Sequence, residues 1–229
     1  MSSPIAKANK SGLDQALILT HQKLSHSRRI AVLAEEYAGR VKSLGIESPR
    51  ILDVGCGDLS LARALSVAVP GSRVQCIDIY PPPKDILERD PFWLNYKQFD
   101  GQNIPFADGC FDFAIFSDVL HHVPEALRGR LLSTSGKAAQ YVLIKDHFEY
   151  GWGSRQMLRA MDFLGNFGYG VSVPRRYFDR SSFAALLETA GLTVEKLDIG
   201  VRLYDHLPLL PALLSPDWQF IALCRRQHH

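Results

Sequence analysis

Ile51-Leu52-Asp53-Val54-Gly55-Cys56-Gly57 is the stretch of this 229-residue chain that says most about its fold. Its first four residues form a short apolar run with the pattern of a buried strand, and the apolar positions after Gly57 recur at helical spacing. Glycines at a strand-to-helix turn let the backbone approach a ligand closely, and the helix that follows presents free N–H groups. The stretch therefore predicts a ligand-binding turn in an α/β protein.

Strands and helices alternate outward from this turn. The spacing of apolar residues predicts helices over residues 13–44, 59–69, 84–88, 125–132, 155–164 and 181–190. It predicts strands over residues 50–54, 73–79, 95–99, 111–116, 141–145, 193–199 and 218–224. Such alternation is typical of a parallel sheet covered by helices on both faces. We expect a single domain, 1–229, with an N-terminal helical segment at 13–46 and an insert at 148–180.

The composition narrows the class of protein. Hydrophobic residues make up 46% of the chain, too many for a disordered protein, and 26 basic against 24 acidic residues leave a net charge of +2. The basic residues are scattered, so we expect no nucleic-acid partner. Four cysteines without a CxxC pair or metal-ligand spacing predict free thiols in a reducing cytosol and no metal site. No apolar run approaches the ~18 residues of a transmembrane helix, so we expect a soluble, cytoplasmic protein of open oligomeric state.

Two further acids follow the next predicted strands. Asp78 ends the second strand, with Ile79 beside it, and Asp100 follows the third. The carboxyl ends of parallel strands meet at the ligand-binding edge of an open α/β sheet. There Asp78 is placed to accept hydrogen bonds from ribose hydroxyls, Ile79 to contact a base, and Asp100 to meet an adenine amino group. Each acid alone fits a turn or helix cap equally well, and their shared edge favours a ligand.

Asp53 suits a ligand with a cationic amino-acid end, because it stands two residues before the first glycine of the turn. A dinucleotide fingerprint would need a third glycine, and Ser60 occupies that place. The turn therefore points away from a pyrophosphate ligand.

These motifs resemble those of class I S-adenosylmethionine-dependent methyltransferases, in the group that includes the ubiquinone/menaquinone C-methyltransferases. The resemblance covers about residues 50–146. It is carried by Ile51 to Gly57, Cys76-Ile77-Asp78-Ile79, Phe99-Asp100-Gly101, Ile104-Pro105-Phe106, Phe111-Asp112 and Ser117-Asp118-Val119-Leu120-His121-His122-Val123. It implies a Rossmann-like seven-stranded sheet, mostly parallel with an antiparallel last strand, and helices on both faces.

The resemblance also implies S-adenosylmethionine as the cofactor and gives roles to the matching positions. The methionine portion would be held by Asp53, Gly55 and Gly57, the ribose by Asp78, the adenine by Asp100 and Gly101, and the region beside the sulfonium by Ser117. Methyltransferases that act on nucleic-acid amines carry an Asn/Asp-Pro-Pro-aromatic motif after the fourth strand, and Ser117-Asp118-Val119-Leu120 differs from it. We therefore expect a small-molecule acceptor.

Histidines supply the candidate catalytic groups. Methyl transfer from a sulfonium needs alignment and exclusion of water, and it needs a base only if the nucleophile must lose a proton. His147 and His121 are the candidate bases, with His122 next in the chain. His147 follows the fifth predicted strand at the ligand-binding edge. For His121 and His122 the favoured interpretation is that they cap or pack the loop, whereas for His147 a structural and a catalytic role fit equally well.

The aromatic and glycine-rich stretch 148–178 is the candidate acceptor site, because aromatic side chains give an apolar wall and glycines permit a mobile cover. A helical insert packed on the sheet is the alternative, with a packing face of Met157, Leu158, Met161 and Leu164. Residues 207–214 are apolar but broken by prolines. An ordinary packed loop is the favoured interpretation of this stretch, and the alternatives are that it lines the acceptor site or touches a membrane surface.

Three functions fit these observations to different degrees. The first is methyl transfer to a small, hydrophobic or lipid-like metabolite. The second is a catalytically silent S-adenosylmethionine-binding subunit or regulator, and the aromatic stretch favours the enzyme over it. The third, an NAD-dependent oxidoreductase, is disfavoured by Ser60. The sequence does not identify the methyl acceptor or tell whether an oxygen, a nitrogen or a carbon atom is methylated.

Overall fold

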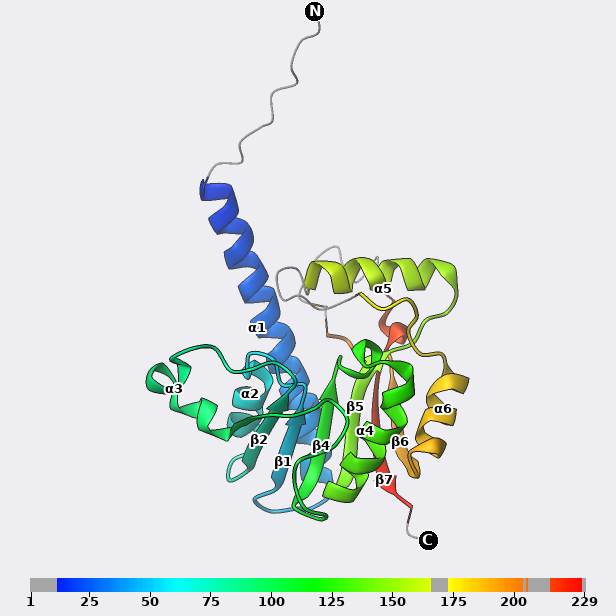
Figure 1. Ribbon diagram of the computed structural model, residues 1–229. Helices are drawn as coiled ribbons and strands as arrows, with labels where there is room; N and C mark the ends of the chain where they lie inside the picture. The colour runs from blue at the N-terminus through cyan, green and yellow to red at the C-terminus, as the bar shows by residue number, and fades with distance from the viewer. Residues whose placement is uncertain (1–11, 166–172, 204, 206–214, 228–229) are drawn as a thin grey trace, which may run out of the picture.

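Seven strands form one mixed sheet in the computed structural model, which describes residues 12–165, 173–203, 205 and 215–227 (Figure 1). They are β1 (Arg50–Val54), β2 (Arg73–Asp78), β3 (Tyr96–Gln98), β4 (Phe111–Ser117), β5 (Ala139–His147), β6 (Leu192–Ile199) and β7 (Gln219–Arg226). Their order is β3-β2-β1-β4-β5-β7-β6. Neighbours among β1 to β5 are parallel, and β7 is antiparallel to both β5 and β6. This order confirms the predicted Rossmann-like sheet with an antiparallel last strand.

Helices cover both faces of this sheet (Figure 1). One face carries α1 (Gly12–Ser43) and α2 (Ser60–Ala68), and the other carries α4 (Glu125–Ala138) and α6 (Arg180–Thr189). The shorter helices are α3 (Ile86–Arg89), η1 (Pro91–Asn95), η2 (Leu120–His122) and η3 (Pro216–Trp218). The remaining helix, α5 (Trp152–Gly165), lies across one end of the sheet. Of the helices described, none combines the length and the apolar character needed to cross a membrane.

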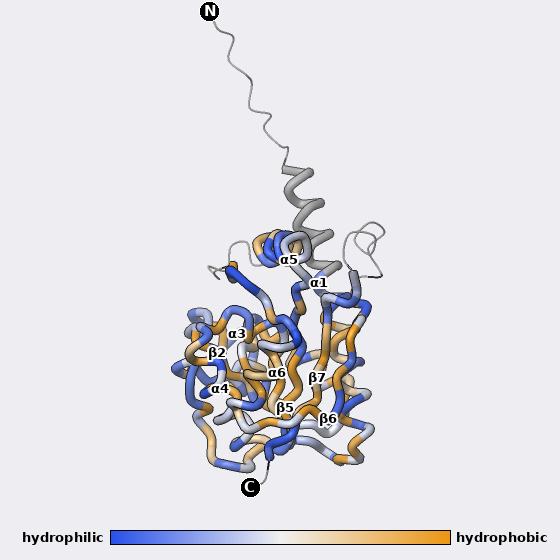
Figure 2. The backbone as a smooth tube through the Cα atoms, turned by 90° about the vertical axis from the view of Figure 1, so that its right-hand side faces the viewer, coloured by the Kyte–Doolittle hydropathy of each residue, from blue (hydrophilic) through white to orange (hydrophobic). Residues whose placement is uncertain are grey.

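The alternation of side chains along the central strands builds two cores, one under each layer of helices. In β5, Tyr141 and Leu143 enter the core beneath α1 and α2, whereas Val142 and Ile144 enter the core beneath α4 and α6. A strand covered on both faces is apolar at nearly every position, and Figure 2 shows β5 and β7 as hydrophobic stretches. This explains why the central strands were predicted from short continuous apolar runs.

Several elements are longer than predicted, among them β5 and α4. The strand expected at 141–145 extends to Ala139–His147, because β7 pairs with it as far as the register of His147 with Gln219. His147 is therefore the last residue of β5, and the prediction that it follows the strand is wrong. The helix expected at 125–132 continues to Ala138, where polar residues such as Ser135 interrupt the apolar period.

Part of the predicted insert lies outside the described residues, namely 166–172, and so does the proline-broken stretch 207–214. Within α5, Leu158 is buried, and Met157 and Met161 are half-buried. This part of the insert therefore packs against the rest of the protein, as the structural alternative expected.

Candidate active site

The two glycines of the β1–α2 turn meet different demands. Both have positive φ, +75° at Gly55 and +53° at Gly57, a region that favours glycine. A Cβ added to Gly55 would lie 2.6 Å from Cγ2 of Val119, so the turn can approach the loop after β4 only with glycine there. A Cβ on Gly57 would meet no atom within 4 Å. The turn is thus anchored at Gly55 and faces open space at Gly57.

Asp53 lies in β1 just before this turn and is buried. Its Oδ2 has no hydrogen-bond partner among the described residues. Burial raises the pKa of Asp53 to about 7, and repulsion from Asp78 adds to the shift. A buried carboxylate without a partner is costly, and a cationic group would satisfy it. This matches the predicted contact with the ammonium of an amino-acid ligand.

Asp78 ends β2 and supports the same turn. Its Oδ2 accepts a hydrogen bond from the backbone N–H of Gly57 at 2.9 Å, and its Oδ1 accepts one from Ile79 at 2.7 Å. Gly101, in the loop after β3, lies close to Ile79, because a Cβ added to Gly101 would be 3.0 Å from Cγ2 of Ile79. The structure therefore brings Asp78, Ile79 and Gly101 together, and it adds a role for Asp78 in holding the glycine turn.

Asp100 is exposed and caps its own turn. Its Oδ1 accepts from the backbone N–H of Gln102 at 2.8 Å and of Asn103 at 2.7 Å, and its Oδ2 accepts from Nδ2 of Asn103. These hydrogen bonds lower the pKa of Asp100. A contact with adenine would have to use the remaining lone pairs of this carboxylate.

Ser117 lies at the carboxyl end of β4, where its Oγ is 2.7 Å from the hydroxyl of Tyr37 in α1. Tyr37 is fully buried, and burial raises its pKa well above the usual value. Sequence reasoning missed Tyr37 as a site residue because it fits the apolar period of α1 and 80 residues separate it from Ser117.

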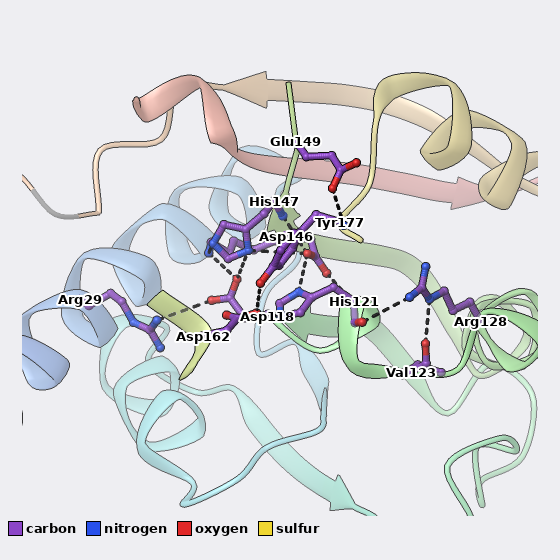
Figure 3. A network of polar contacts seen from close by, with 11 residues as sticks. Arg29, Asp118, His121, Val123, Arg128, Asp146, His147, Glu149, Asp162 and Tyr177 are labelled. Carbon is purple, nitrogen blue, oxygen red and sulfur yellow. Dashed lines mark hydrogen bonds and ion pairs between the residues drawn. The ribbon is translucent and has the colours of Figure 1, made fainter. Parts of the chain in front are cut away.

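A buried histidine–carboxylate pair stands at the same edge (Figure 3). Nδ1–H of His121, in η2, donates to Oδ1 of Asp146 at 2.6 Å, and the backbone N–H of His121 reaches Oδ2 at 3.3 Å. Asp146 lies in β5 and also accepts from the backbone N–H of His147 at 2.7 Å. The carboxylate thus holds the Nδ1 edge of the imidazole and directs Nε2 away from β5.

Asp162 of α5 faces that second nitrogen. Its Oδ2 lies 3.4 Å from Nε2 of His121 and also accepts a hydrogen bond from the hydroxyl of Tyr177. Burial disfavours a charged imidazole, but Asp146 and Asp162 together outweigh it and raise the pKa of His121 to about 10. Sequence reasoning missed Asp162 and Tyr177, which sit in a polar-aromatic insert without a recognisable motif.

His147 belongs to a different set of contacts. Its Nδ1 lies 3.3 Å from Oδ1 of Asp118, and its Nε2 lies 3.5 Å from Nζ of Lys145. That buried ammonium is 2.5 Å from the same oxygen of Asp118, and Arg29 of α1 is 3.8 Å from the other oxygen. Burial, followed by the charge of Lys145, lowers the pKa of His147. His147 is thus engaged in an ion-pair network, whereas His121 presents a nitrogen to α5.

Comparison with known protein families identifies the family of this chain. A model of the methyltransferase domain matches residues 24–197, well over half of the chain. The chain belongs to this family. Its sheet is that of the class I, S-adenosylmethionine-dependent methyltransferases. No curated protein sequence matches this methyltransferase significantly.

Solved structures of methyltransferases share this fold. The mitomycin 7-O-methyltransferase MmcR is 21% identical with a TM-score of 0.62, over 95% of this chain and 59% of MmcR. This chain therefore spans less than two thirds of the length of MmcR. The 1,6-didemethyltoxoflavin-N1-methyltransferase of Burkholderia thailandensis, crystallised with 1,6-didemethyltoxoflavin and S-adenosylhomocysteine, is 18% identical with a TM-score of 0.57, over 100% of this chain and 94% of that one. At these identities the likeness concerns the fold.

Proposed function

We propose that this methyltransferase methylates a hydroxyl group of a small, apolar acceptor and that His121 is its general base. The observation that carries the proposal is the buried pair of His121 and Asp146, joined at 2.6 Å at the carboxyl edge of the sheet. Such a pair can orient a base and stabilise its charged form, which catalysis requires and cofactor binding alone does not. The pair therefore favours catalysis over the alternative of a silent subunit or regulator.

The residues of the β1–α2 turn fit the cofactor. Asp53 keeps one buried oxygen without a partner, as an ammonium ligand requires, and Gly57 faces open space. Asp78 would hold the ribose, Ile79 and Gly101 the adenine with Asp100 at its rim, and Ser117 would lie near the sulfonium. When bound, S-adenosylmethionine supplies an activated methyl group, so the protein's own residues have to align the acceptor and handle its proton.

His121 is arranged to take that proton. Asp146 accepts from Nδ1–H, so the neutral imidazole offers the lone pair of Nε2 to a proton of the acceptor. Because the pKa of His121 is raised to about 10, this neutral form is the minor one at pH 7, and its share grows as the pH rises. Asp146 and Asp162 then stabilise the imidazolium that forms, because one carboxylate flanks each ring nitrogen. An oxygen nucleophile with a proton to lose gains from this arrangement. A carbon acceptor, as in the ubiquinone/menaquinone C-methyltransferase group, remains the alternative and would depend less on His121.

An apolar acceptor is supported by the aromatic side chains around α5. The ring of Tyr177 lies 5.3 Å from that of His121 and 6.0 Å from that of His147. Tyr150, Trp152 and Phe163, on or next to α5, are all more than half exposed. Phe163 follows Asp162, which contacts His121, and a large exposed apolar side chain at such a place is typical of a surface that binds an apolar ligand.

A labelled-methyl transfer screen over extracted metabolites and lipids tests the proposal, with the product identified by mass. On the acceptor so found, His121→Gln should lower kcat by roughly 10²–10⁴-fold, since a base is lost, while the Kd of S-adenosylhomocysteine stays unchanged. The exposed histidine His26 provides the matched control, and His26→Gln should keep its activity. Full activity of His121→Gln would show that another group, or none, removes the proton.

A further inference from the structure

Two groups of side chains in the described residues bring three metal-ligating atoms within 4.8 Å of one another. They are Asp118, His121 and His147, and His121, His122 and Asp162. In the first group the carboxylate is already neutralised, because Nζ of the buried Lys145 lies 2.5 Å from Oδ1 of Asp118. A metal ion there would meet a second cation at close range. The second group has no such ammonium on its carboxylate among the contacts described.

We propose that Nε2 of His121, a ring nitrogen of His122 and Oδ2 of Asp162 form a binding site for one divalent transition-metal ion such as Zn²⁺. Two imidazoles and one carboxylate are ligands that zinc-class ions prefer. They come from two elements, η2 for the adjacent histidines and α5 for the acid. The site is therefore complete only when α5 lies over the loop after β4, as it does in this structure.

The spacing of the ligands fits such an ion. Nε2 of His121 is 3.4 Å from Oδ2 of Asp162. With metal–ligand bonds of about 2.0–2.2 Å, two ligands of a tetrahedral ion stand roughly 3.3–3.6 Å apart. The rings of His121 and His122 lie with their centroids 4.1 Å apart, which brings the third ligand to the same place. Little rearrangement of this pair would be needed on binding.

His121 is held as histidine ligands of metal ions usually are. Its side chain is fully buried, and the contact of its Nε2 with Oδ2 of Asp162 is an ion pair at 3.4 Å, with no hydrogen bond to Nε2 among the described residues. The other nitrogen donates to Asp146, which is the outer carboxylate that histidine ligands of metal ions usually have. Asp162 is oriented in turn by the hydroxyl of Tyr177. The ligands are thus positioned by a second layer of hydrogen bonds.

Binding of the ion has a consequence for the reaction. The lone pair of Nε2 that would bind the ion is the one that takes the acceptor's proton, so the ion and proton transfer exclude each other. Zn²⁺ should therefore inhibit methyl transfer in competition with the acceptor. This consequence rests on the proposed function, whereas the binding of the ion does not.

Titration of the full-length chain with ZnCl₂ in a calorimeter, and with CoCl₂ followed by visible absorption, tests the site without an activity measurement. The wild type should bind one ion per chain. His122→Ala and Asp162→Asn should each weaken binding by more than about tenfold, and Asp146→Asn, which removes the outer carboxylate, by about 10–100-fold. S-adenosylhomocysteine binding by each variant verifies that it is folded.

Control variants separate this site from other histidines of the chain. His26→Ala, and the double variant His228→Ala with His229→Ala, should bind the ion as tightly as the wild type. Absence of binding by the wild type, or equal affinity in His122→Ala and the wild type, would overturn the site. Either result would leave His121 as the base intact, since its test is the loss of turnover in His121→Gln.

Discussion

At the scale of single residues, we expect Asp53 to make the affinity for the cofactor depend on pH. Its pKa is raised to about 7, above the ordinary value of 3.8, so the folded apoprotein binds a proton that the unfolded chain releases. The stability that this proton contributes is fully present below pH 3.8 and is lost as pH rises through about 7. In the proposed contact, the ammonium of the cofactor would stabilise the ionised carboxylate instead, so binding would release the proton.

We therefore expect the Kd of S-adenosylhomocysteine to fall as pH rises from about 5.5 to about 7 and to level off above that range. Calorimetry in buffers of different ionisation enthalpy measures both the Kd and the proton released. Asp53→Asn cannot titrate and should remove the dependence. A wild-type Kd that is flat over this range would contradict the contact between Asp53 and the ammonium.

Asp78 holds the glycine turn, and we propose that it also accepts from the ribose, so one substitution would remove both interactions. Asp78→Ala should weaken S-adenosylhomocysteine binding by roughly 1–3 kcal/mol, because the ribose hydroxyls lose a charged acceptor and the N–H of Gly57 loses its partner. Calorimetry gives the Kd, and denaturant unfolding shows the effect on the turn itself. A folded variant with an unchanged Kd would confine Asp78 to the turn.

At the scale of elements, the β1–α2 turn depends on its two glycines to different degrees. Gly55→Ala should destabilise the fold by about 1–3 kcal/mol, since the added Cβ lies 2.6 Å from Val119 and the residue keeps φ at +75°. Gly57→Ala has the positive φ but open space, so its loss of stability should be smaller. Urea unfolding of the two variants measures the difference. Equal losses would contradict the close approach of Val119.

The start of α6 offers a test of an element distant from the cofactor. Asp179 accepts a hydrogen bond from the backbone N–H of Ser182, and the Ser182 hydroxyl accepts one from the backbone N–H of Asp179. Asp179→Ala should lower the free energy of unfolding by about 1 kcal/mol without changing S-adenosylhomocysteine affinity. Arg180→Ala, at the neighbouring exposed position, serves as the control. A change in affinity would show that α6 is coupled to the cofactor site.

At the scale of the whole molecule, the cofactor should stabilise the fold. A ligand that binds only the native state adds about 2.7 kcal/mol at a free concentration about a hundredfold above its Kd. Thermal unfolding with S-adenosylmethionine or S-adenosylhomocysteine should therefore show a higher Tm, whereas a nicotinamide dinucleotide should leave it unchanged. Absence of a shift with both sulfur ligands would contradict the cofactor assignment.

Local patterns in the sequence were enough to predict the architecture of the sheet and its candidate cofactor-binding edge. Alternating strand and helix periods are local, so they predicted the order of elements, and parallel strands necessarily place Asp53, Asp78 and Asp100 at one edge. The short apolar run before Gly55 sufficed to locate the ligand-binding turn. Periodicity was less informative where polar residues continue an element, as in Asp146 and His147 at the end of β5.

The contacts of the histidines, in contrast, could be found only in the folded chain. His121 and Asp146 are 25 residues apart and meet because β4 and β5 are adjacent and in register, so that their carboxyl ends bring η2 and Asp146 together. Asp162 reaches the second nitrogen because α5 lies across that edge. These contacts depend on strand register and helix placement, which are set by packing between distant parts of the chain. No local pattern of residues could therefore predict them.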